Sequence, residues 1–276
     1  MDISVFAYNF KLAKEPHEIY FDWVGYKVGI FKCRCKKCGK SLLGRSDNMR
    51  VLPILFNSEM VRAILDGRKT VTRRVVKPQH LKVLDSPYHK THPEVPDDVL
   101  IKKLCEPPYH TGDILYVRET WQECCRNTIH SQIVHNKYCF KASVDNPIYG
   151  CIDRECGQIC NWKPSIHMPK EAARIWLKVT DVRVERLQEM SDDDCVKEGI
   201  RAWTKDGKLY KYFPADKEGD YPNCAWSECP RTPKEAMEKI WNFTIKKSDL
   251  NRYGWEANPW VWVVESERCE KPEEKK

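Results

Sequence analysis

The chain has 276 residues, 41% of them hydrophobic, with 47 Lys and Arg against 40 Asp and Glu and a net charge of +7. This length allows one large domain, or one domain with extensions, and the apolar content is sufficient for a core. No apolar run approaches the roughly 20 residues that a membrane-spanning helix needs, so no membrane partner is expected. The mild basic excess favours phosphate-bearing ligands only weakly.

The first residues carry acidic side chains and lack a small-residue cleavage site after an apolar block, so no secretory signal is expected. Fourteen cysteines without such a signal indicate reduced thiols, some of them metal ligands, in a cytoplasmic protein. We expect structural zinc and no organic cofactor.

Two groups of cysteines have spacings that suit zinc. Residues 1–48 are interpreted as an N-terminal extension, where Cys33, Cys35 and Cys38 form a knuckle without an obvious fourth ligand nearby. A second site is predicted in a long loop that needs such a constraint. Its ligands are Cys151, Cys156 and Cys160, with Cys124 or its neighbour Cys125 as the fourth.

A core domain is predicted over residues 49–270, with insertions at 75–110, 122–165 and 201–232 and a charged tail at 271–276. In chain order, the pattern predicts a helix at 57–67, a short helix at 97–104, a strand at 114–121 and a long strand or hairpin at 173–187. Helices at 191–198 and 233–245 and a strand at 259–264 follow. This order is neither a βαβ series nor a helical bundle. It predicts an α+β fold, a small and mostly antiparallel barrel with flanking helices and long inserted loops.

The run from Gly67 to Arg74 follows the first helix and brings cationic and hydroxyl side chains onto a predicted strand. Because side chains alternate along a strand, Thr70, Thr72 and Arg74 share one face unless the strand starts with a bulge. A pocket lined by Lys, Thr and Arg suits an anion or a polarised carbonyl. The alternative is a solvated basic strand edge.

The core pattern resembles the ASCH domain of the PUA-like superfamily. The matching segments span about residues 51–267 and are the first helix, Gly67-x-Lys69-x-x-Thr72-x-Arg74, the Gly112-Asp113 strand start, the Glu198-Gly199 helix end and the strand at 260–265. Residues 162–169 and 254–260 look like the larger ASCH proteins of phages and prophages. The resemblance implies a PUA-like barrel with a cleft for RNA or a modified nucleoside.

One branch of that family hydrolyses the acetyl amide on the exocyclic amine of cytidine. The resemblance implies that Lys69, Thr72 and Glu198 match its catalytic Lys, Thr and Glu, and that Arg74 matches its closing Arg. An amidohydrolase would need the pKa of Lys69 to fall by burial beside Arg73 or Arg74. The alternative keeps Lys69 charged in a structural ion pair with Glu198. The chain is then a non-catalytic module that binds RNA or other nucleic acid.

Four further residues are candidate ligand contacts. Thr70 follows Lys69 directly, and Glu119 ends a strand where it either accepts hydrogen bonds from a base or pairs with Arg118 or Arg74. Trp121 either stacks on a base or belongs to the core. His167, held between prolines, either contacts the ligand or caps a strand.

Overall fold

The computed structural model describes residues 49–123, 138–143, 162–214 and 226–273, together with the short strands β1 (Ile19–Phe21) and β2 (Cys33–Cys35). These two strands pair antiparallel, with Ile19 opposite Cys35. The side chains of all seven predicted zinc ligands lie outside the described residues, so the zinc sites stay predictions.

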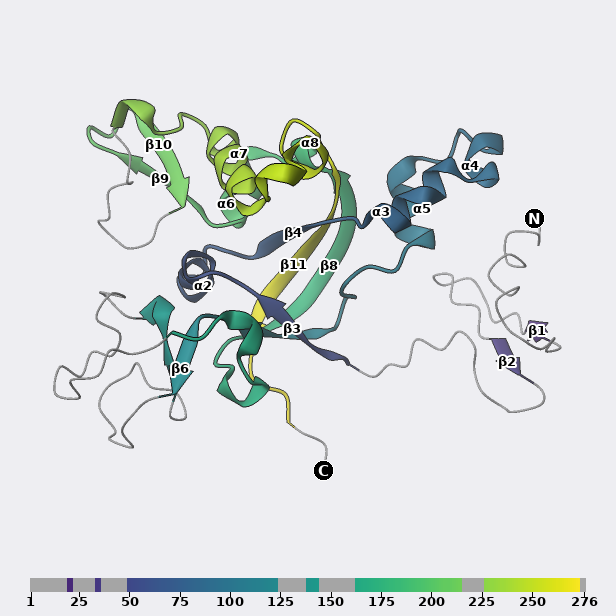
Figure 1. The fold of residues 1–276 in the computed structure, drawn as a ribbon, viewed down its shortest axis with the longest axis horizontal. Coiled ribbons are helices and arrows are strands. Elements are labelled where there is room, and N and C mark those ends of the chain that lie inside the picture. The colour runs from purple at the N-terminus through teal and green to yellow at the C-terminus, as the bar shows by residue number, and fades with distance from the viewer. Residues whose placement is uncertain are drawn as a thin grey trace.

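The core of the fold is a five-stranded sheet in the order β3-β5-β8-β11-β4 (Figure 1). Its strands are β3 (Val51–Leu55), β4 (Val71–Val75), β5 (Ile114–Arg118), β8 (Trp176–Arg186) and β11 (Trp260–Cys269). β3 and β5 run parallel, and every other neighbouring pair runs antiparallel. The fold is therefore α+β with a mostly antiparallel sheet, as predicted.

The sheet does not close, and the expected barrel is wrong in that respect. The edge strands β3 and β4 have no hydrogen-bonded ladder between them in the described structure. The helix α2 (Ser58–Leu65) connects these two strands along the chain. One side-chain contact spans the edges, because Nη2 of Arg74 donates to the carbonyl oxygen of Leu55 at 3.2 Å.

The sequence determines both ends of α2 as predicted. The side chain of Asn57 accepts a hydrogen bond from the amide of Met60 at 2.8 Å, which caps the first turn. The helix ends before Gly67, whose φ of +74° is the left-handed conformation that glycine adopts at low cost.

Two hydrophobic cores lie on opposite faces of the sheet. The first core includes Phe56 and Ile64 and also receives α5 (Asp97–Leu104) through Ile101. The second packs under α7 (Pro233–Thr244), with Met237 and Trp241 as contacts. In Figure 1, α6 (Asp192–Lys197) and α7 lie together on one side, while α3 to α5 lie apart from them.

The insertions contain more regular structure than the sequence indicated. Residues 75–110 form α3 (Pro78–Leu81), the 3-10 turn η1 (Lys82–Asp85), α4 (Pro87–Thr91) and α5, where only the helix at 97–104 was predicted. The segment at 201–232 contains an antiparallel hairpin of β9 (Ile200–Thr204) and β10 (Tyr210–Pro214). The pair β6 (Trp121–Glu123) and β7 (Tyr138–Phe140) lies at the start of and within the second insertion, 122–165.

The remaining elements are short helices and turns. They are η2 (Lys141–Ser143), η4 (Ser165–His167), η5 (Lys170–Ala172), η6 (Leu187–Glu189), η7 (Trp226–Glu228), η8 (Lys247–Asp249) and α8 (Leu250–Tyr253). Within the described part of the chain, no helix has the length and apolar character of a membrane span.

Candidate functional site

The site is centred on Lys69, whose ammonium group has three acceptors. Its Nζ donates to the backbone oxygen of Val71 at 2.8 Å, to the backbone oxygen of Glu198 at 3.0 Å and to Oε2 of Glu198 at 2.5 Å. An ammonium has three protons, so each one has a partner. The side chains of Lys69 and Glu198 are 2% and 6% exposed, which makes this a buried ion pair.

Burial changes the proton affinity of Lys69. Desolvation is the largest influence and lowers the pKa of Lys69 from its ordinary value of 10.5. The charge and hydrogen bond of Glu198 oppose this shift, whereas the nearby charges of Arg74 and Arg73 add to it. The net direction is downward, as a lysine that acts as a base requires.

A second cation holds the other oxygen of Glu198. Nη1 of Arg73 donates to Oε1 of Glu198 at 3.2 Å, and the Arg73 side chain is fully buried. The same guanidinium donates to Oε1 of Glu185 at 2.6 Å and 3.0 Å and lies 3.5 Å from Asp194. Glu198 is therefore clamped between an amine and a guanidinium.

The clamp extends to the molecular surface through Arg183. This arginine contacts Glu185 at 3.3 Å and Asp194 at 3.5 Å, and it also pairs with Glu265. Burial raises the pKa of Asp194, but hydrogen bonds from Ser191 together with the charges of Arg73 and Arg183 outweigh it, so the net pKa is lowered. Asp194 therefore favours the ionised state.

Local sequence explains how Glu198 reaches Lys69. Ser191 and Asp194 form a reciprocal capping box that starts α6, and Glu198 is the residue that ends it. The next residue, Gly199, has a φ of +107°, and a Cβ there would meet the Cβ of Ala63 at 3.0 Å. Glycine thus permits both the turn and the close approach of α6 to α2.

Thr72 is connected to the site through Arg74. The strand alternates as predicted, and Val71 belongs to the second core. On the neighbouring strand, Thr72 pairs with Val264 and Arg74 pairs with Trp262, and both of these partners belong to the first core. The Thr72 hydroxyl accepts a hydrogen bond from Nη1 of Arg74 at 3.2 Å. Among the described residues, no hydrogen bond joins Thr72 to Lys69 or Glu198.

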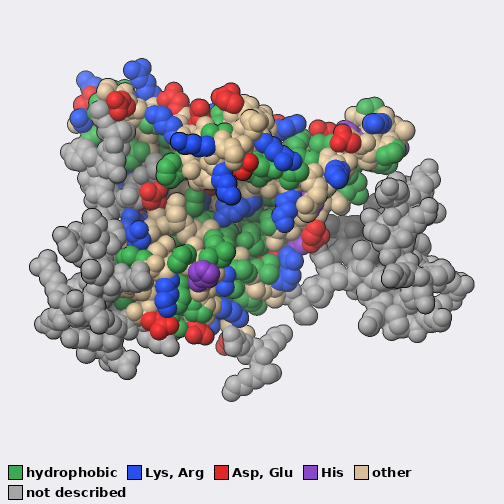
Figure 2. Space-filling model, viewed as in Figure 1, with side chains coloured by type: hydrophobic (Ala, Val, Ile, Leu, Met, Phe, Trp, Pro, Cys, Tyr) green, Lys and Arg blue, Asp and Glu red, His purple; other side chains and the backbone are tan. Residues whose placement is uncertain are grey.

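The ring of Phe56 relates these groups in space. Nζ of Lys69 lies 5.7 Å from the centre of this ring, and Cζ of Arg74 lies 5.6 Å from the same centre. The amine of Lys69 and the guanidinium of Arg74 therefore lie beside one buried aromatic side chain, and Thr72 is connected to it only through Arg74. Figure 2 shows Lys and Arg side chains among hydrophobic ones in the middle of the face that is also seen in Figure 1.

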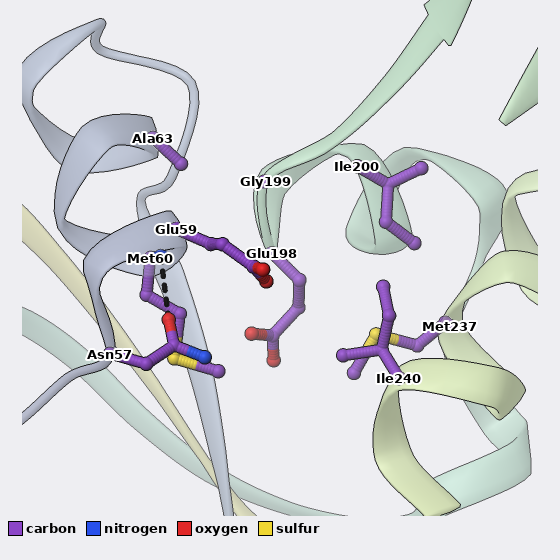
Figure 3. Close-up of a pocket in the computed structure, with 9 residues that line it drawn as sticks. All are labelled: Asn57, Glu59, Met60, Ala63, Glu198, Gly199, Ile200, Met237 and Ile240. Carbon is purple, nitrogen blue, oxygen red and sulfur yellow. Dashed lines mark hydrogen bonds between the residues drawn. The ribbon is translucent and has the colours of Figure 1, made fainter. Parts of the chain in front are cut away.

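A pocket opens beside the carboxylate of Glu198. It lies between α2, the end of α6 and α7, and its lining includes Asn57, Met60, Met237 and Ile240. Figure 3 shows the Glu198 carboxylate between the methionine of α2 and the side chains of α7. The carboxylate of Glu198 is thus held by Lys69 and Arg73 and also borders the pocket.

Among the described residues, no hydrogen bond joins the other predicted ligand contacts to the side chains of Lys69 and Glu198. Both oxygens of Glu119 accept hydrogen bonds from Arg174, at 2.9 Å and 3.0 Å, so the ion-pair alternative has a different partner from the expected Arg118 or Arg74. Trp121 packs in a third core beside Tyr138. His167 is exposed in η4, and Thr70 is exposed beside Lys69.

The sequence did not predict that Arg73 contacts Glu198. Its partners Glu185, Asp194 and Glu198 come from β8 and α6, more than 100 residues away along the chain. The sequence contained one indication of this role, because strand alternation places the cation Arg73 on the same face as the apolar Val71. Comparisons of the chain with family models, curated proteins and solved structures found no match.

Proposed function

We propose that this chain is an ASCH-type, PUA-like protein that binds a nucleobase-containing ligand and hydrolyses an N-acyl amide on the exocyclic amine of cytidine. The observation that carries this proposal is the buried 2.5 Å contact between Lys69 and Glu198 beside a pocket. Lys, unlike Arg, can lose its proton within a protein. A Lys–Glu pair is therefore able to act as a base and an acid in succession.

The chemistry starts with proton transfer from Lys69 to Oε2 of Glu198, which leaves a neutral amine and a neutral acid. The amine then takes the proton of the Thr72 hydroxyl while its oxygen attacks the acyl carbon, after a side-chain movement that brings Thr72 within reach. Arg74, which already donates to this hydroxyl, stabilises the oxyanion.

The C–N bond breaks as Glu198 returns its proton to the leaving amine. Lys69, now an ammonium again, passes its proton to Glu198 a second time. Water then attacks the acyl ester on Thr72 while the neutral Lys69 takes a proton from it, and Glu198 returns its proton to the Thr72 oxygen as the C–O bond breaks. The sum is one amide and one water converted to one carboxylic acid and one amine. In this scheme Arg73 keeps the carboxylate of Glu198 directed toward Lys69 through the opposite oxygen.

The test is turnover of N4-acetylcytidine by the purified full chain, followed by release of cytidine. Lys69→Met, Thr72→Val and Glu198→Gln should each lower kcat/KM by about 100-fold or more, the usual contribution of acid–base and nucleophilic groups. The matched control is Lys211→Met, which removes another buried lysine, one that donates to the backbone oxygen of Cys229 at 2.8 Å. Equal losses in all four folded variants would contradict the proposal.

The second candidate is a non-catalytic module that binds RNA, favoured by the cations that converge around Phe56. In that case no N-acyl cytidine is turned over. RNA binding then weakens with added salt, and Lys69→Ala reduces the affinity without abolishing it. DNA in place of RNA distinguishes the two nucleic acids.

We also propose structural zinc bound by the cysteines at 33–38 and 124–160. The expected content is about one or two zinc ions per chain, and their removal should unfold the segments they hold. Elemental analysis of the purified protein tests this, with Cys38→Ser and Cys156→Ser to distinguish the two sites. A metal-free preparation with an unchanged circular dichroism spectrum would contradict it.

A further inference from the structure

The pocket beside Glu198 has walls of one chemical kind. Met60 of α2 faces Met237 and Ile240 of α7 across it, and the buried Ile200 closes one side (Figure 3). The cavity between these walls is small, with a volume of about 40 Å³, and it opens to solvent. Methionine side chains are unbranched and flexible, so such walls adapt to an apolar chain of variable length.

The polar groups of the pocket determine which functional group can link the apolar chain to the rest of a ligand. The carboxylate of Glu198 lies between the walls, and Figure 3 shows the carboxylate of Glu59 directed toward it. The side-chain oxygen of Asn57 is occupied as the cap of α2. Carboxylates attract N–H donors and repel phosphate and other anions. The lining therefore suits an amide N–H followed by an apolar group, and it disfavours an anion.

We propose that this pocket is an acyl subsite, which takes the chain of an N-acylated ligand while the amide N–H donates to Glu198. The inference rests on the proposed amide hydrolysis and names its substrate class: N-acyl amides whose straight chain is longer than acetyl. The chain lies against Met60, Met237 and Ile240, and the scissile bond faces the Lys69–Glu198 pair. The reaction remains the hydrolysis by one water described above.

The first experiment compares kcat/KM for N4-acetyl-, N4-butyryl- and N4-hexanoylcytidine. Each methylene removed from water should raise kcat/KM by about fourfold until the pocket is full, so butyryl, with two more methylenes, should exceed acetyl by roughly 16-fold. Ile240→Trp fills the pocket and should abolish this gain. Phe243→Trp is the matched control, because Phe243 is on the same helix but 92% exposed.

The second experiment measures binding independently of turnover. Methyl-labelled methionine is observed by NMR while N4-hexanoylcytidine is added, and Met60→Leu and Met237→Leu assign the two signals. Both signals should shift saturably in the wild-type chain, with weaker binding for N4-acetylcytidine. In Ile240→Trp the longer ligand should lose its advantage.

The outcomes separate the two proposals. Hydrolysis with equal kcat/KM along the series and no effect of Ile240→Trp overturns the acyl subsite and leaves amide hydrolysis intact. Saturable shifts of Met60 and Met237 without turnover of any substrate support the subsite and overturn the catalytic proposal. Absence of both turnover and shifts overturns the two together.

Discussion

Two buried carboxylates in this protein have opposite surroundings. Glu119 is 1% exposed and both of its oxygens accept from Arg174, whose third contact is the hydroxyl of Ser143 at 2.6 Å. Glu198 has one oxygen on Lys69 and the other on Arg73, and it borders a pocket. An arginine stays charged, whereas a buried lysine can release its proton. The first pair therefore stabilises the fold, and the second suits proton transfer.

The two pairs also differ in what happens when one partner is lost. Among the described residues, Glu119 has Arg174 as its one cationic partner, so removal of Arg174 would leave a buried carboxylate without a compensating charge. Burial raises the pKa of Glu119, and the hydrogen bonds and charge of Arg174 oppose this shift only in part. Glu198 has two cationic partners and keeps one after either is removed. Four measurements examine this contrast.

The largest effect is expected from Glu119→Ala, because the guanidinium of Arg174, only 14% exposed, would lose its carboxylate partner. Breaking such a pair costs about 3–5 kcal/mol of unfolding free energy, measured by urea denaturation at pH 7. The double variant Glu119→Ala/Arg174→Met should recover part of this loss. A double variant as unstable as the sum of the single variants would show that the two residues are not coupled.

Lys69→Met should cost less, about 1–3 kcal/mol, because Arg73 still compensates the charge of Glu198 and the methionine chain fills the same buried space. The same denaturation experiment measures it. A loss as large as that of Glu119→Ala would mean that Arg73 does not compensate the charge of Glu198 when Lys69 is absent.

The pH dependence should separate the lysine pair from the arginine pair. Because burial lowers the pKa of Lys69, the unfolded chain binds more protons there between the lowered pKa and 10.5, so the stability contributed by this group rises with pH in that interval. The slope is at most about 1.4 kcal/mol per pH unit. Unfolding at pH 8, 9 and 10 should show this rise in wild type and Arg174→Met but not in Lys69→Met.

The smallest effect is expected at an exposed pair. Asp66 accepts from Arg68 at 2.8 Å, but its side chain is 55% exposed. Asp66→Ala should change the unfolding free energy by less than about 1 kcal/mol, and less still in high salt. A loss of several kcal/mol of unfolding free energy at this position would contradict the view that burial determines how much an ion pair contributes to stability.

The parts of the fold that the sequence predicted well are those with local signals. The helix α2 begins at its Asn57 cap, α6 at its Ser191 cap and α7 after Thr232, whose side chain caps the first turn. Alternation along β4 correctly assigned Thr72 and Arg74 to one face. Capping and strand alternation depend on neighbours a few residues apart, so the chain alone contains that information.

The hairpin β9–β10 was missed although it carried a local signal. Asp206-Gly207 lies between two runs with aromatic residues, and Gly207 has a φ of +72°. The side chain of Asp206 accepts from the amides of Lys208 and Leu209, which stabilises the turn. An Asp-Gly pair between strand-forming residues is a hairpin signal that the long polar segment concealed.

By itself, the sequence determined the caps, the glycine positions and the alternation that direct Lys69, Thr72 and Glu198. The tertiary structure decided the partners: Arg73 meets Glu185, Asp194 and Glu198 only because β4 and β8 flank β11, with α6 packed over them. It also decided that the sheet stays open between β3 and β4. These outcomes depend on contacts between distant segments, where packing and burial outweigh any preference of the local chain.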